Sequence, residues 1–369
     1  MKTIERELDI DPVSLRIMEP YFKGMSYGVF DIETTGLSPV YSIIMLAGFV
    51  TVRGGKAVLK QFFARTPSEE PEVIKAALAE IASLDYLVTF NGKMFDLPFL
   101  SKRAAKYGLL EASAPKDLFG LLSSDESPAE KPLNLKAKYD LDLFVLMKYY
   151  SDLGSMIGSL SQKNLEAYMG IDVLRRDEIS GEESVRLYNN YVSFPTREAE
   201  EQILLHNSDD VCQLTRLLGI LTRCDLHRAL SRNGFPVSCG IVKSISINRK
   251  ALVIKGVSDD PSEYFSFPSE ERPYNFYMSG DDGSFEITVP CESEAGALYV
   301  DAIPLLSRVS GAGSVRDTSE IFMPREIAEL PGFTNGYLVI KNPAGSDHTD
   351  WLGINLFARH LTERIFSEI

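Results

Sequence analysis

A pair of adjacent glycines, Gly54 and Gly55, stands between two apolar runs rich in β-branched residues and restricts how this part of the chain can fold. Residues 42–52 precede the pair and residues 57–64 follow it, and each run has the length and composition of a strand. Two glycines accept the positive φ angles of a tight hairpin turn. With a strand-like segment at residues 27–32, after a polar leader, the sequence predicts three consecutive antiparallel strands.

Helical and strand-like segments follow these three strands. Apolar residues recur at helical spacing after Pro71, and a short apolar strand is predicted at residues 87–90. The further predicted elements are a helix at 98–108, a strand at 139–144 and a long helix at 196–221. Residues 112–132 are rich in Ser, Pro, Asp and Glu, which favours a solvated loop or an insertion.

The predicted secondary structure changes at residues 231–236, from long helices before this segment to short strands after it. Short β-type runs dominate the part that follows, and apolar residues at helical intervals predict a terminal helix at residues 351–366. We therefore predict two domains, residues 1–234 and residues 235–369. The first is expected to be of the α/β class, and the second to be smaller, β-rich and of the α+β class.

The chain is acidic, with a formal net charge of −14. Phosphate neutralisation needs clustered Lys and Arg, so this charge argues against a protein that coats nucleic acid through a large basic surface. Any contact with nucleic acid should therefore be confined to a small part of the protein surface. Residues 235–369 hold 11 Lys and Arg against 19 Asp and Glu, a net charge of −8. For this domain we predict contact with a protein partner, or gating of a substrate.

The four cysteines show neither CxxC pairing nor the regular spacing of a disulfide or zinc framework. The first residues, MKTIERELDIDP, are charged and lack the apolar core of a signal peptide, and no later apolar run has the length of a membrane span. We therefore expect reduced thiols in a cytoplasmic protein that is neither secreted nor inserted in a membrane.

Two carboxylates end the first predicted strand, where alternation places Asp31 and Glu33 on the same face. An isolated pair of this kind is most often a solvated strand end. Here the pair is followed by Thr34, Thr35 and Gly36, a small and hydroxylated turn whose backbone could approach a ligand closely.

The segment NGKMFD, residues 91–96, directly follows the predicted strand at residues 87–90. Asp96 therefore falls at the start of the next helix, where a plain N-cap carboxylate is the alternative to a functional one. Asn91 and Gly92 form a common turn pair.

The segment HNSDD, residues 206–210, lies inside the long predicted helix. Residues four apart share one helical face, so His206 and Asp210 can point at the same place. An exposed polar face, or a structural His–Asp pair, is the alternative. Apolar neighbours indicate that much of this helix is buried, where a polar patch needs partners.

Together the three segments supply the carboxylates Asp31, Glu33, Asp96 and Asp210, with one imidazole. Four nearby carboxylates repel one another unless cations bind, and hard oxygen ligands favour Mg²⁺ or Mn²⁺. Two such ions, typically about 3.5–4 Å apart, can activate a water and stabilise the leaving oxygen in phosphodiester hydrolysis. The sequence therefore predicts two divalent metal ions as cofactors.

The segments FDIETTG, NGKMFD and HNSDD, in this order, resemble the three exonuclease motifs of the DEDD, or DnaQ-like, superfamily. The longer phrases FDIETTGLSP and VTFNGKMFDLPFL are most similar to its YprB-type ribonuclease H-like branch, as is SLSQKNLEAYMGI at residues 159–171. The resemblance covers about residues 25–225 and leaves out the last third of the chain. It implies a ribonuclease H-like mixed sheet flanked by helices, and a 3′ to 5′ exonuclease.

The resemblance implies a role for each motif residue. Asp31 would bridge both metal ions. Glu33 and Asp210 would complete one metal site, and Asp96 would support the other directly or through water. His206 would orient and deprotonate the attacking water.

The resemblance also implies contacts with the terminal nucleotide. The candidate substrate-binding residues are Thr34, Thr35, Gly36, Leu37, Asn91 and Phe95. Turn formation and core packing are the alternatives for these residues, above all for the apolar Leu37 and Phe95.

His206 mixes two patterns of this superfamily. The subgroup that uses Tyr places it four residues before the final Asp, whereas the subgroup that uses His places it five before. Four residues along a helix leave His206 roughly 40° from Asp210, so we expect it to reach the metal site from the helix itself. Asp209 is the rival ligand, but it would point about 100° away from Asp210.

The leading prediction is a metal-dependent 3′ to 5′ exonuclease that acts on the 3′ end of single-stranded DNA or RNA. One alternative is a metal-dependent hydrolase of short oligonucleotides or nucleotides, which would suit the acidic surface. The other is a non-catalytic nucleic-acid-binding module with the same fold. DNA and RNA stay equal candidates, because discrimination depends on contacts near the sugar 2′ position.

Overall fold

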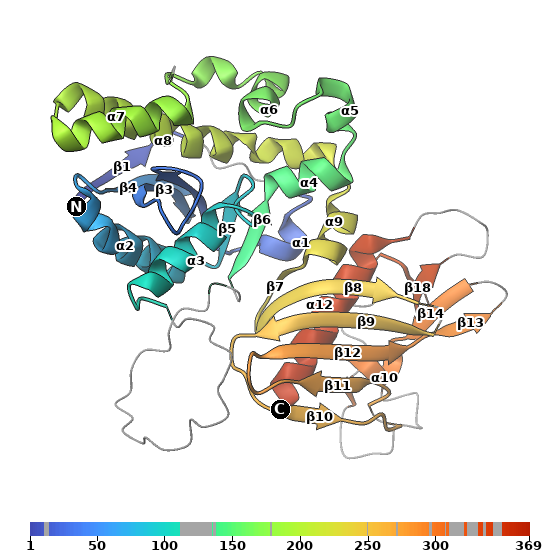
Figure 1. The fold of residues 1–369 in the computed structure, drawn as a ribbon. Coiled ribbons are helices and arrows are strands. Elements are labelled where there is room, and N and C mark those ends of the chain that lie inside the picture. The colour runs from blue at the N-terminus through green and yellow to red at the C-terminus, as the bar shows by residue number, and fades with distance from the viewer. Residues whose placement is uncertain are drawn as a thin grey trace, which may run out of the picture. The chain divides into compact units, whose positions relative to one another are not determined.

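The computed structural model describes the chain except for residues 11–14, 111–134, 136–137, 178, 249, 271, 295–296, 307, 310–320, 323–330, 335–336 and 342–348 (Figure 1). The described residues form two units, the first made of Met1–Met18 and Lys23–Cys224 and the second of Glu19–Phe22 and Asp225–Ile369. The predicted loop at residues 112–132 lies outside the described residues. Among the helices that are described, none combines the length and the apolar character that crossing a bilayer requires.

Three consecutive strands form the antiparallel centre of the first unit's sheet, as predicted. They are β2 (Tyr27–Thr34), β3 (Ile44–Arg53) and β4 (Lys56–Phe63). Gly54 and Gly55 connect β3 to β4 with φ angles of 55° and 79°. The turn therefore uses backbone conformations that glycine adopts without strain.

Three further strands complete a six-stranded mixed sheet in the order β1-β4-β3-β2-β5-β6. β5 (Tyr86–Thr89) lies parallel to β2, and β6 (Tyr139–Asp142) lies parallel to β5. At the other end of the sheet, β1 (Lys2–Leu8) pairs antiparallel with β4. The expectation of a mere polar leader before residue 27 is wrong, because a partly exposed edge strand can carry polar residues.

The predicted strand at residues 139–144 is too long. β6 ends at Asp142, whose side chain accepts the amide of Val145 at 3.2 Å and so caps the helix that follows. The sequence patterns also do not predict the run of helices after this point, which are α4 (Leu143–Tyr150), α5 (Leu153–Ile157), α6 (Gln162–Met169) and α7 (Gly181–Ser193).

The long helix predicted at residues 196–221 is α8 (Arg197–Leu217), followed by the 3-10 turn η3 (Leu218–Arg223). Thr196 begins it, because its side chain accepts the amide of Ala199 at 3.2 Å. Acidic residues in its first turn add to the stability of this end by compensating the helix dipole.

Helices cover both faces of the sheet (Figure 1). α2 (Glu70–Ala82) and α3 (Asp96–Lys106) pack on one face, over a core that includes Phe30 of β2. α7 and α8 pack on the other face, over a core that includes Phe63 of β4. Successive residues of a strand point to opposite faces, so Asp31 and Glu33 lie on the side of α8.

The second unit is β-rich, as predicted. Its largest sheet has the antiparallel order β10-β11-β12-β9-β8-β7, and a four-stranded sheet has the order β13-β14-β18-β17. Its strands are β7 (Phe235–Val237), β8 (Gly240–Ile247), β9 (Ala251–Ser258), β10 (Tyr264–Ser266), β11 (Asn275–Met278), β12 (Ser284–Pro290), β13 (Glu292–Glu294), β14 (Ala297–Asp301), β15 (Arg308–Val309), β16 (Ile321–Phe322), β17 (Phe333–Thr334) and β18 (Tyr337–Lys341). Its helices are α1 (Glu19–Phe22), α9 (Leu226–Asn233), α10 (Ile303–Leu306) and the predicted terminal helix, α12 (Trp351–Glu368).

A buried ion pair between α2 and α3 fixes the loop that leads from β2 to β3. The side chain of Glu70 is 0% exposed and that of Arg103 is 2% exposed. Arg103 Nε donates to Glu70 at 2.7 Å, and Nη1 donates to the carbonyl of Pro39 at 3.1 Å. Glu70 also accepts the amide of Ile44 at 2.9 Å and the hydroxyl of Tyr107 at 2.6 Å. One network therefore holds the middle of the loop, at Pro39, and the start of β3, at Ile44.

Arg103→Ala is expected to lower the free energy of unfolding by about 3–5 kcal/mol, because it leaves the buried Glu70 carboxylate without its partner. Denaturant unfolding, with hydrogen exchange on β3 peptides, measures the effect. Arg186→Ala is the control, since Arg186 forms an exposed pair with Glu183 at 3.4 Å that is worth less than about 1 kcal/mol. Equal losses in both variants would contradict the role of the network.

Candidate active site

The candidate site lies where β2 and β5 separate. β5 pairs with β2 only along residues 27–29, so the edge of β2 beyond Val29 is not paired with β5. α3 begins beside this edge, and Oδ1 of Asp96 accepts the amide of Ile32 at 3.1 Å. Open α/β sheets place ligand sites beyond the carboxyl ends of parallel strands, at the point where the strand order reverses. Asp96 thus comes next to Asp31 and Glu33 of β2.

A tight turn over residues 91–96 presents Asp96. Asn91 has a φ of 65°, the left-handed conformation that Asn tolerates better than most residues. Its carbonyl accepts the amide of Met94 at 3.1 Å. Asp142, at the end of β6, accepts the amides of Asn91 at 2.9 Å and Lys93 at 3.2 Å. This role of Asp142 was not predicted, because only its place at a strand end marks it in the sequence.

Asp31 is held by a side chain of α8. Nδ2 of Asn207 donates to Oδ2 of Asp31 at 3.0 Å, and Oδ1 of Asn207 accepts from Gln61 at 3.0 Å. Gly48 on β3 makes room for this contact, because a Cβ at this position would lie 1.9 Å from Oδ1 of Asn207. The motif HNSDD contains Asn207, but its spacing does not indicate this role.

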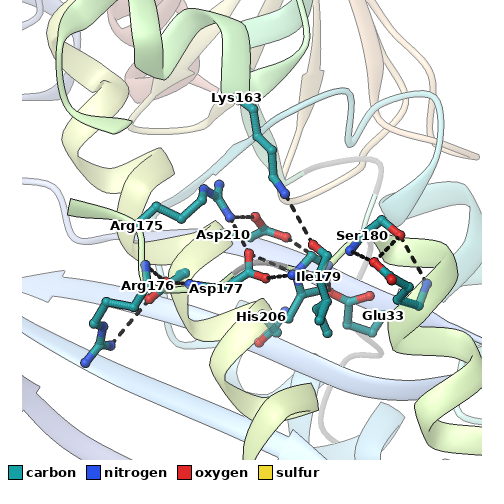
Figure 2. A network of polar contacts seen from close by, with 12 residues as sticks. Glu33, Lys163, Arg175, Arg176, Asp177, Ile179, Ser180, His206 and Asp210 are labelled. Atoms are coloured by element: carbon teal, nitrogen blue, oxygen red, sulfur yellow. Dashed lines mark hydrogen bonds and ion pairs between the residues drawn. The ribbon is translucent and has the colours of Figure 1, made fainter. Parts of the chain in front are cut away.

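Glu33, His206 and Asp210 come together as possible metal ligands (Figure 2). One ligand atom of each lies within 4.8 Å of the others. Nε2 of His206 is 3.7 Å from Oε1 of Glu33 and 3.6 Å from Oδ2 of Asp210. The four-residue spacing on α8 therefore directs His206 and Asp210 to the same place.

A segment before α7, residues 175–177, contacts the site and was not predicted (Figure 2). Nη1 of Arg175 donates to Oδ1 of Asp210 at 2.7 Å and to Oδ2 of Asp177 at 2.9 Å. Oδ2 of Asp177 lies 3.1 Å from Nδ1 of His206. Glu166 of α6 holds the guanidinium group from the other side, accepting from Nε at 3.0 Å.

Asp209 faces a different direction from Asp210. Its Oδ2 accepts the amides of Arg176 at 2.5 Å and Asp177 at 2.8 Å. Asp209 thus anchors the segment at residues 175–177, and Asp210 faces His206. This geometry favours Asp210 over Asp209 as the metal ligand.

Burial changes the acidity of the carboxylates. Burial, together with the charge of neighbouring carboxylates, raises the pKa of Asp31 and the pKa of Glu33 well above their ordinary values. Burial also raises the pKa of Asp210, and it raises the pKa of Asp96 to about 7. Such a cluster of hard oxygen donors fits divalent cations, which favour the ionised carboxylates.

The last residue of β2 and the loop after it contain four of the candidate substrate-binding residues. The hydroxyl of Thr34 donates to the carbonyl of Gly36 at 2.9 Å, and the hydroxyl of Thr35 accepts the amide of Ile43 at 3.0 Å. Leu37 is 86% exposed. Thr34 and Thr35 therefore shape the turn, while Leu37 stays open to a ligand.

Phe95 is half-buried and packs against the core of α2 and α3, with its ring centroid 5.6 Å from that of Phe99. This contact supports core packing as its role. Tyr41, which the motifs did not indicate, is 90% exposed in the loop after β2, and Met94 is 75% exposed in the turn before Asp96. A large apolar side chain that is strongly exposed is the feature that marks these two residues as candidate ligand contacts.

Asp96→Asn is expected to stabilise the metal-free protein at alkaline pH. The pKa of Asp96 is about 7 in the fold, above its ordinary value of 3.8, so the free energy of unfolding falls as the pH rises from about 4 towards 7. Asparagine stays neutral and its side-chain oxygen can still accept the amide of Ile32. Urea unfolding in EDTA should show similar stabilities near pH 4 and, near pH 8, a gain for the variant of a few kcal/mol. A variant less stable than the wild type near pH 8 would refute this expectation.

Comparison with known proteins relates the first unit to a family and to two polymerases. The family described as the RNase_H superfamily matches residues 29–222, more than half of the chain. The DNA polymerase of Methanocaldococcus jannaschii is 33% identical over 106 residues, which are 27% of this chain and 6% of that protein. The DNA polymerase III PolC-type of Ureaplasma parvum is 30% identical over 131 residues, which are 30% of this chain and 9% of that protein.

The chain spans less than a tenth of the length of either polymerase. The structure of the family B DNA polymerase from the hyperthermophilic archaeon Pyrobaculum calidifontis matches 53% of this chain and 24% of that chain, at 19% identity and a TM-score of 0.39. The family match at residues 29–222 includes the strands and helices that carry all four carboxylates, and the mixed sheet flanked by helices is the predicted ribonuclease H-like fold. The chain belongs to the RNase_H superfamily.

Proposed function

We propose that this protein is a DEDD-type, metal-dependent 3′ to 5′ exonuclease that acts on single-stranded DNA or RNA. One observation carries the proposal. In a member of the RNase_H superfamily, burial and the charges of neighbouring carboxylates raise the pKa of Asp31 and of Glu33. Ligand atoms of Glu33, His206 and Asp210 also lie within 4.8 Å of one another, close enough to share a metal ion. Such an arrangement is costly unless cations bind, and nucleic-acid hydrolysis is the chemistry that it suits.

Asp31, Glu33, Asp96 and Asp210 would hold two divalent ions, Mg²⁺ or Mn²⁺. When bound, such ions lower the pKa of a water molecule and offset negative charge on the phosphate. The protein's own donors, Asn207 on Asp31 and the amide of Ile32 on Asp96, orient these carboxylates before any ion binds.

His206 is the proposed general base. Its Nε2 faces Glu33 and Asp210, at 3.7 Å and 3.6 Å. From the middle of α8 (Arg197–Leu217), it can accept a proton from a water molecule beside the phosphate. Leu37 and Tyr41 in the loop after β2 and Met94 in the turn before Asp96 are all strongly exposed, and they supply apolar surface that suits the bases of an unpaired strand.

The acidic composition limits nucleic-acid contacts to this site. A net charge of −14 suits recognition of a strand end, which needs fewer phosphate contacts than a long duplex. The second unit, with its acidic composition, is proposed to contact a protein or to gate the substrate. We propose that the protein is located in the cytoplasm.

Asp31→Asn is expected to abolish hydrolysis of a 5′-labelled single strand with little loss of folding, because it removes a charge shared by both proposed metal sites. With Mg²⁺ or Mn²⁺ the wild type should shorten matched DNA or RNA strands stepwise from the 3′ end, and EDTA should stop it. The surface variant Arg186→Ala should keep full activity. Near-normal activity in Asp31→Asn would exclude the two-metal proposal.

The same assay separates the alternatives. Hydrolysis of dinucleotides without hydrolysis of longer strands would favour a hydrolase of short substrates. Metal-dependent binding without any hydrolysis would favour a binding module. Internal cuts would show endonucleolytic cleavage and would contradict the proposed exonuclease.

His206→Ala is expected to lower turnover on the order of 100-fold, as loss of a general base does. Asp210→Asn should be inactive, whereas Asp209→Asn should retain turnover, because Asp209 accepts main-chain amides that an asparagine oxygen can still accept. Single-turnover rates at saturating metal measure these effects. Full turnover in His206→Ala, with an inactive Asp209→Asn and an active Asp210→Asn, would show that both assignments are wrong.

A further inference from the structure

The two nitrogens of the His206 imidazole face different groups (Figure 2). Nδ1 lies 3.1 Å from Oδ2 of Asp177, whereas Nε2 lies 3.7 Å from Glu33 and 3.6 Å from Asp210. The side chain of His206 is only 5% exposed, so water has little access to the ring. A neutral imidazole carries one proton, and its partners determine which nitrogen holds it.

Asp177 is fixed in place. Its Oδ1 accepts the amide of Ile179 at 2.8 Å, and its Oδ2 accepts from Arg175 at 2.9 Å. Its own amide donates to Asp209 of α8 at 2.8 Å, on the same helix as His206. The carboxylate cannot turn away from His206 without losing one of these bonds.

We propose that Asp177 is a positioning residue, which keeps the proton of the neutral His206 ring on Nδ1 and directs the lone pair of Nε2 towards Glu33 and Asp210. The inference rests on the proposed function, because it concerns the base of that reaction. A carboxylate accepts a hydrogen bond and cannot donate one. No described group meets hydrogen-bond geometry at Nδ1, but Asp177 lies closer to Nδ1, at 3.1 Å, than Glu33 or Asp210 lies to Nε2, at 3.7 Å and 3.6 Å. The nearer negative charge therefore favours the tautomer with the proton on Nδ1.

The proton balance of the reaction gives Asp177 a second effect. Water transfers a proton to Nε2 of His206, its oxygen bonds to phosphorus, and the bond between phosphorus and the 3′ oxygen breaks. The departing oxygen takes a proton from a second water molecule, and the resulting hydroxide is neutralised by the proton from the imidazolium. Asp177 stabilises that imidazolium, because its negative charge faces the protonated Nδ1.

Arg175 couples Asp177 to the proposed metal ligand Asp210. One nitrogen, Nη1, donates to both carboxylates, at 2.9 Å and 2.7 Å. Glu166 accepts from Nε at 3.0 Å and from Nη2 at 2.7 Å, so the guanidinium group is held on its other edge. A ligand and the partner of the base are thus oriented by one rigid, planar group.

The tautomer can be measured by NMR on the metal-free full chain, independently of activity. The chain has four histidines, and His206→Gln identifies the His206 signals in a long-range ¹H–¹⁵N correlation spectrum. At a pH at which the ring is neutral, we expect the wild-type proton on Nδ1, and in Asp177→Ala a shift of population towards Nε2. Glu183→Gln is the matched control, because Glu183 is exposed and anchors the nearby amide of Ser180 at 2.9 Å. It should leave the His206 signals unchanged.

Kinetics on a single-stranded oligonucleotide provide the second measurement. Asp177→Ala and the nearly isosteric Asp177→Asn are expected to lower kcat on the order of 10- to 100-fold and to leave KM within about twofold, since orientation and not binding is lost. A wild-type ring protonated on Nε2, or an Asp177→Ala variant with unchanged tautomer and kcat, would overturn the inference. If the wild type hydrolyses no nucleic acid but the tautomer shifts in Asp177→Ala, the proposed function fails and the positioning by Asp177 stands.

Discussion

Repulsion between buried carboxylates is the constraint on which the rest of the first unit depends. Removing a carboxylate from water is costly, and a second negative charge nearby adds to the cost. Each of Asp31, Asp96 and Asp210 meets a different donor, namely an amide side chain of α8, a main-chain amide of β2 and a guanidinium group. These donors belong to separate elements. The arrangement therefore forms only when the sheet, α3, α8 and the segment at residues 175–177 are all in place.

The donors offset only part of the charge. A single guanidinium group, that of Arg175, serves Asp177, Asp210 and Glu166, so the cluster remains acidic. This residual charge is what divalent cations would compensate. An acidic protein and a phosphodiester substrate are compatible under these conditions, because the local potential at the reacting atoms, and not the net charge of the chain, governs their contact.

The parts of the structure that are determined by residues close together in the sequence could be predicted. The turn at Gly54 and Gly55 follows from two residues, and the shared direction of His206 and Asp210 follows from helical spacing. β1 could not be predicted, because a partly exposed edge strand lacks a clear apolar alternation. Arg175 could not be predicted either, since it reaches Asp210 across 35 residues of sequence and such tertiary contacts leave no local pattern.

Gly48 carries no functional group, yet the absence of its Cβ lets Asn207 sit between Gln61 of β4 and Asp31 of β2. Asn207 donates to the carboxylate only while α8 lies this close to β3. A methyl group added on β3 would push the amide away and leave the charge on the adjacent strand less compensated. Adding volume at Gly48 of β3 would therefore change the electrostatic potential at Asp31, on the adjacent strand β2.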